Sequence, residues 1–135
     1  MDVHLKLVGI TLIVLATLHA VFPRYFSWRE ELASLSLINR QVMYVHTFFI
    51  ALILILMGLL CLSSSQELIE TSLGNKIALG LLIFWFVRLV IQFFGYSSQL
   101  WKGKRFETVV HILFSLLWAY FSIVFFAVYW FGSNK

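Results

Sequence analysis

Charged residues are scarce in this sequence of 135 residues, in which Asp, Glu, Lys and Arg together make up 12%. A soluble globular domain usually carries about 25% of them. Hydrophobic residues reach 61%, so the composition excludes a soluble domain and predicts an integral membrane protein. The net charge of +4 then indicates orientation in the lipid bilayer and contact with anionic lipid, and nothing else in the sequence favours nucleic-acid binding.

Cysteine and proline occur only once each. Cys61 alone allows neither an intrachain disulfide nor a thiolate cage around a metal ion. The motifs HExxH, Glu-x-x-His, GxSxG and CxxC are missing, as is a glycine-rich phosphate loop. These absences exclude the enzyme classes that depend on such motifs, and they leave scattered polar side chains as the candidates for function.

Long apolar runs fill most of the chain. A membrane helix needs about 20 apolar residues to cross a hydrocarbon core of roughly 30 Å, and the runs are continuous, without the alternation of barrel strands. We therefore predict an all-α polytopic protein of the cell membrane, with four transmembrane helices in an up-down-up-down bundle that forms a single domain over residues 1–135. The predicted spans are 3–22, 39–62, 76–98 and 107–131.

The connector between the first two spans, 23–38, has features of its own. Pro23 is expected to end the first helix, and the SWRE segment at 27–30 matches a capping box. Apolar residues then recur at helical spacing at Trp28, Leu32 and Leu35. This pattern predicts a short amphipathic helix in the membrane interface.

Positive charge is unevenly distributed between the two ends of the bundle. Six of the ten Lys and Arg residues lie in or beside the connectors 23–38 and 99–106, whereas three lie at the termini and the 63–75 connector. The positive-inside rule then predicts that the first two connectors are cytoplasmic and that both termini are on the non-cytoplasmic side.

Three histidines are expected near the cytoplasmic ends of three different helices. His19, His46 and His111 fall roughly 5 to 9 Å inside that boundary at the helical rise. Neutral imidazole suits zinc, copper and iron, and three imidazoles leave a fourth position open for water or substrate. Glu107, one turn before His111, is expected to bind its second ring nitrogen or the metal ion itself. We therefore predict a transition-metal site at His19, His46, His111 and Glu107.

A haem b site is an almost equally good interpretation of the same residues. In such a bundle the second and fourth helices are diagonal, so His46 and His111 would ligate opposite faces of one haem. The scarcity of small residues near these histidines counts against a macrocycle, and the sequence leaves both alternatives open.

Arg88 is the costliest polar residue within a span, because a charge at the centre of a membrane helix costs about 2.5 to 3.5 kcal/mol. The acidic residues all lie nearer the membrane surfaces, so none is expected to pair with it at the same depth. Arg88 and Gln92 share one helical stripe, as do His111 and Trp118 on the last span, which predicts that both stripes face inward. We predict that Arg88 and Gln92 bind a small anionic or carbonyl-bearing ligand. The structural alternative is that Arg88 binds Gln92 and backbone carbonyls and only holds the helices together.

Three functional hypotheses follow. The favoured one is a metal- or haem-binding protein for redox or enzymatic chemistry, with a buried His/Arg polar cluster near the cytoplasmic side. The second is a transporter or proton-coupled channel, which in so small a bundle requires a homo-oligomer. The third is an accessory subunit of a larger membrane complex, in which the polar cluster is structural.

Overall fold

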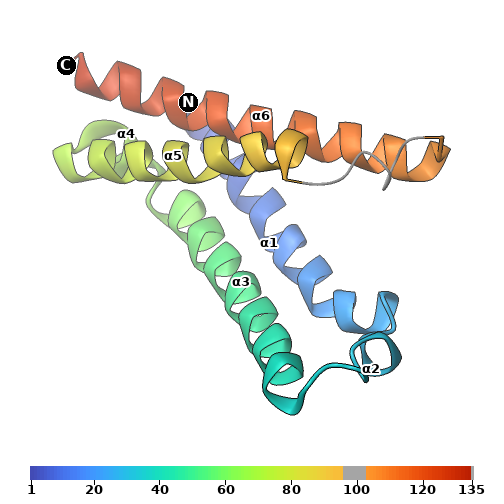
Figure 1. The fold of residues 1–135 in the computed structure, drawn as a ribbon. Helices are drawn as coiled ribbons and strands as arrows, with labels where there is room; N and C mark the ends of the chain where they lie inside the picture. The colour runs from blue at the N-terminus through green and yellow to red at the C-terminus, as the bar shows by residue number, and fades with distance from the viewer. Residues whose placement is uncertain (96–102, 135) are drawn as a thin grey trace. The chain divides into compact units, whose positions relative to one another are not determined.

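The computed structural model describes residues 1–95 and 103–134. Helices joined by turns account for all of these residues, and no strand occurs in either described range (Figure 1). The prediction of an all-α fold is thus confirmed. The helices are α1 (Asp2–Tyr25), α2 (Trp28–Glu31), α3 (Leu37–Ser63), α4 (Ser65–Glu70), α5 (Ser72–Phe94) and α6 (Arg105–Ser133).

Helices α1, α3, α5 and α6 are long and apolar enough to cross a membrane. They correspond to the four predicted spans, although α5 begins four residues earlier than 76–98, and residue 98 lies outside the described residues. The up-down-up-down order, the single domain, the cytoplasmic side and the interfacial position of the connector stay predictions.

Contacts along the chain divide it into two compact units. The N-terminal unit is Val3–Ser65, and the C-terminal unit is Gln66–Lys135 together with Met1–Asp2. Each unit contains one pair of long helices, α1 with α3 and α5 with α6. The two pairs are held together by different kinds of side chain.

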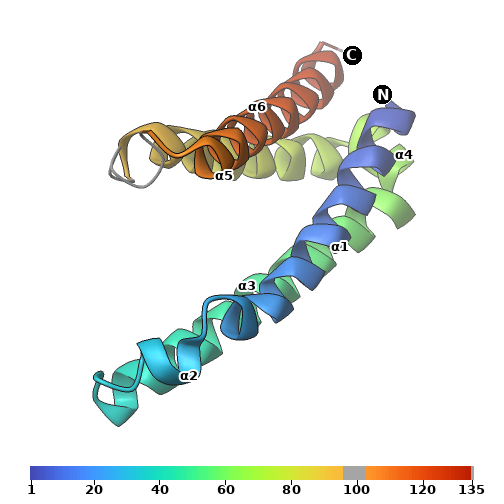
Figure 2. The same ribbon diagram turned by 90° about the vertical axis from the view of Figure 1, so that its right-hand side faces the viewer.

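In the N-terminal unit, α1 lies against α3 at a pair of glycines (Figure 2). A Cβ atom built on Gly9 would lie 2.8 Å from the carbonyl oxygen of Gly58 and 3.2 Å from Cβ of Cys61. Cys61 is completely buried. Close backbone approach at small residues is a usual way for membrane helices to pack, because it increases van der Waals contact without the hydrophobic effect.

In the C-terminal unit, α5 and α6 run side by side in opposite directions (Figure 1). Their shared core is aromatic, with Trp85, Trp118 and Phe121 buried together. Near the start of α5, Asn75 Nδ2 donates a 2.7 Å hydrogen bond to the carbonyl oxygen of Tyr129 near the end of α6. The pair is therefore fixed both by ring packing and by polar contacts.

The connector after α1 differs from its predicted structure. Helix α1 continues through Pro23 to Tyr25, so Pro23 does not end it as predicted. The missing N–H of proline removes one backbone hydrogen bond, and only two residues of the helix follow. Ser27 is left-handed, with φ of 53°, and its side chain makes no cap hydrogen bond. The predicted capping box is therefore wrong, and α2 is a single turn. Ser36 is the serine that caps a helix, since its Oγ accepts from the backbone N–H of Asn39 at the start of α3.

Candidate functional site

Arg88 and Gln92 occupy successive turns of α5 and contact each other. Arg88 Nη1 donates to Gln92 Oε1 at 3.2 Å, and the side chain of Gln92 is only 7% exposed. At the helical rise, Arg88 lies about 9 Å before the end of α5 at Phe94. The guanidinium points toward that end of the helix, as expected for a charged group that escapes the membrane centre.

Trp118 on α6 also contacts the guanidinium. Its Nε1 donates to Gln92 Oε1 at 3.3 Å, and its ring centroid lies 5.2 Å from Cζ of Arg88, a cation–π contact. Trp118 itself stacks on Trp85 with 5.0 Å between ring centroids. Sequence reasoning places Trp118 on the stripe of His111 but misses its role as a donor to Gln92. One signal in the sequence could have indicated this role, because the N–H of a buried indole usually needs a hydrogen-bond partner.

The hydrogen bonds of Gln92 fix the orientation of its amide. Arg88 and Trp118 carry only donors, so the atom that both contact must be the amide oxygen. The amide nitrogen then faces α6, where it lies 3.0 Å from His111 Nδ1. Because the amide nitrogen is a donor, Nδ1 accepts this bond and the proton of the neutral imidazole is on Nε2.

Two histidines of the N-terminal unit, His19 and His46, have the opposite arrangement. His19 Nδ1 lies 2.8 Å from the carbonyl oxygen of Leu15, and His46 Nδ1 lies 2.8 Å from that of Val42. A carbonyl only accepts, so in both residues Nδ1 carries the proton and Nε2 carries the lone pair. His19 and His46 are therefore in the form that binds metal ions through Nε2.

The predicted metal site stays a prediction, because His19 and His46 belong to the N-terminal unit, whereas Glu107 and His111 belong to the C-terminal unit. Within 1–95 and 103–134, no group of three or more His, Cys, Asp or Glu side chains could hold a metal ion. His46 is exposed, and so are Asn39, Met43 and Ile50, which share its stripe on α3 and were expected to face inward with it. The buried residues of α3, Leu54, Gly58 and Cys61, all lie in the later half of the helix. Glu107 is exposed in the first turn of α6.

The structure brings together four residues of the two stripes that were predicted to face inward. They are Arg88 and Gln92 on α5 and His111 and Trp118 on α6. The guanidinium of Arg88 and the Nε2–H of His111 are hydrogen-bond donors, and the guanidinium carries a fixed positive charge. No protein-family model, no curated protein and no solved structure matches the chain. Its function is therefore argued from this geometry.

Proposed function

We propose that the chain is a multi-pass membrane protein whose α5–α6 pair binds a small anionic or carbonyl-bearing molecule at Arg88, Gln92 and His111. The observation that carries the proposal is the double role of the Gln92 amide. Its oxygen holds the guanidinium of Arg88, and its nitrogen sets the tautomer of His111. Both neighbours consequently present N–H donors, and their natural complement is an oxygen acceptor such as a carboxylate or a quinone carbonyl.

The electrostatics of the site support an anionic partner in particular. The ring of Trp118 attracts the guanidinium but does not neutralise its charge. A charged residue within a membrane helix is by default part of a functional site, because lipid offers it no compensation. The competing explanation is the accessory-subunit hypothesis, in which the same contacts only join α5 to α6. The two explanations differ in what happens to ligand binding when Arg88 loses its charge.

Binding to full-length protein in lipid nanodiscs tests this proposal. Decylubiquinone supplies a carbonyl probe and dodecanoate a carboxylate probe, and the fluorescence of Trp118 beside Arg88 reports their approach. We expect saturable binding of at least one probe, weakened tenfold or more by Arg88→Met. The matched control is Lys104→Met, which removes an exposed charge just before α6. Equal affinities in both variants, or no saturable binding to the wild type, would contradict the proposal.

Metal or haem b binding is a second candidate, favoured by the Nε2 lone pairs of His19 and His46. His111 would join such a site only after moving its proton from Nε2 and giving up its bond to Gln92. Elemental analysis of protein purified without a histidine tag is the test. The candidate predicts about one zinc, copper or iron per chain, lost in His46→Ala and retained in His4→Ala, and a visible absorption band with iron selects haem b. A metal-free wild type rules this candidate out.

A further inference from the structure

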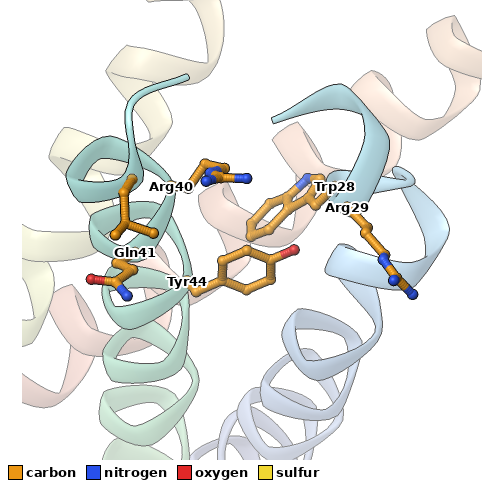
Figure 3. A pocket seen from close by; sticks show the side chains of 6 residues that line it. Trp28, Arg29, Arg40, Gln41 and Tyr44 are labelled. Carbon is orange, nitrogen blue, oxygen red and sulfur yellow. The ribbon is translucent and has the colours of Figure 1, made fainter. Parts of the chain in front are cut away.

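A hollow of about 270 Å³ lies in the N-terminal unit, between α2 and the first two turns of α3 (Figure 3). Two arginines line it, and no carboxylate does, although Glu30 and Glu31 follow directly in α2. The lining residues are Trp28, Arg29, Leu37, Arg40, Gln41 and Tyr44.

Arg40 gives the hollow its chemical character. Its guanidinium extends toward Trp28 (Figure 3). Its Nε is buried and makes no hydrogen bond within the part of the chain that the structure describes. A buried donor on a charged group is unfavourable without an acceptor, and residues 1–95 and 103–134 supply none for Arg40 Nε.

The walls of the hollow are partly apolar. Trp28 is 8% exposed, and its ring meets that of Tyr44 edge to face with 5.5 Å between centroids. Leu37 lines the hollow and is also the first residue of α3. The N-terminal end of a helix carries partial positive charge, which adds to the field of Arg40.

Arg29 supplies a second positive charge at the rim. Its side chain is exposed and extends away from the two rings in Figure 3. Exposed side chains change rotamer within picoseconds to nanoseconds, so this guanidinium is available to an anion that enters the hollow.

We propose that this hollow binds a phosphate group. The planar guanidinium of Arg40 matches two phosphate oxygens and gives its Nε an acceptor. Arg29 adds charge, and the Tyr44 hydroxyl donates a further hydrogen bond. The phosphate belongs either to the headgroup of an anionic phospholipid or to a soluble phosphate. The site shares no residue with the Arg88 cluster, so either proposal can fail without the other.

The test measures both sources of phosphate on the full-length chain. Native mass spectrometry of protein delipidated in detergent and titrated with phosphatidic acid, with phosphatidylcholine as the neutral comparison, reports lipid binding. Broadening of the ³¹P NMR signal of inorganic phosphate reports soluble binding. The variants are Arg40→Gln and Tyr44→Phe, and Arg24→Gln is the matched control, because Arg24 is an exposed arginine of the same unit outside the lining.

We expect Arg40→Gln to weaken phosphate binding at least tenfold and Tyr44→Phe about threefold, while Arg24→Gln leaves it unchanged. If only phosphatidic acid shows this pattern, the phosphate is that of a lipid headgroup, and if inorganic phosphate also shows it, the site accepts soluble phosphate. Equal effects of Arg40→Gln and Arg24→Gln would overturn the proposal, as would equal binding of phosphatidylcholine. Should Arg40→Gln not fold, as judged by circular dichroism, an unchanged affinity in Tyr44→Phe and Arg40→Lys together overturns it.

Discussion

Helices α1 and α3 approach each other at glycines, whereas α5 and α6 meet through stacked indoles and the amide of Gln92. Lipid tails are as apolar as the helices, so neither pair gains from the hydrophobic effect inside a membrane. The first pair relies on close backbone contact, which any added side-chain atom disturbs. The second relies on hydrogen bonds and ring contacts, which depend on particular atoms. The two pairs should therefore respond to different substitutions.

The largest effect is expected at the glycine contact. A Cβ on Gly58 would lie 2.8 Å from the carbonyl oxygen of Gly9 and 2.8 Å from Cγ1 of Ile13. Gly58→Leu should thus lower the free energy of unfolding by about 3 kcal/mol or more, the upper range for overpacking, as measured by thermal unfolding in detergent. The matched control is Gly80→Leu, since a Cβ there meets no described atom within 4 Å. Equal destabilisation by both would disprove the glycine contact.

A smaller loss is expected when the amide between α5 and α6 is removed. Gln92→Leu keeps the volume of the side chain but leaves Arg88, Trp118 and His111 without their shared partner. Loss of a buried hydrogen-bond partner costs about 1 to 3 kcal/mol, which chemical denaturation in detergent can resolve. Gln66→Leu, at an exposed residue with a 3.4 Å contact to Asp2, should change stability very little. Identical denaturation curves for Gln92→Leu and the wild type would contradict this role.

The indole of Trp118 is tested by Trp118→Phe. This change removes the Nε1–H that contacts Gln92 and one ring of a buried indole, but it retains an aromatic ring beside Trp85. We expect a loss of about 0.5 to 1.5 kcal/mol from the hydrogen bond, to which the lost packing of the second ring adds, in the same denaturation measurement. Trp130→Phe, at an exposed tryptophan stacked on Phe126, is the comparison and should have a smaller effect. The reverse order would show that the indole N–H of Trp118 is not important.

The smallest effect is spectroscopic and concerns which ring nitrogen of each histidine carries the proton. Nitrogen-15 NMR should find the proton on Nδ1 in His19 and His46 and on Nε2 in His111. In Gln92→Leu, His111 should lose this preference while His19 and His46 keep theirs. If His19, His46 and His111 share one tautomer in the wild type, the orientation of the Gln92 amide, on which the proposed function depends, is wrong.

Hydropathy alone predicts the four long helices, because an uninterrupted apolar run has few alternatives to a helix in lipid. The meeting of Gln92 with His111 also agrees with the predicted inward stripes on their two helices. The stripe of His46 is exposed, since the spacing shows which residues share a face but not where along the helix that face finds a partner, which in α3 is at Leu54, Gly58 and Cys61. The sequence pattern also did not predict that α1 continues through Pro23 or that Ser27 adopts a left-handed conformation. The histidine tautomers could not be predicted, because they depend on hydrogen-bond partners that the sequence does not identify.

Helix α6 has 29 residues and is therefore about 43 Å long, well beyond a hydrocarbon core of roughly 30 Å. Such an excess of length is met by tilting or by extension into the headgroup region. The bond from Asn75 to Tyr129 near one end and the Gln92 amide farther along prevent α6 from sliding past α5. In a membrane the two helices would then adjust to a thinner or thicker bilayer as one body, so that a change in bilayer thickness would act on the Arg88 cluster.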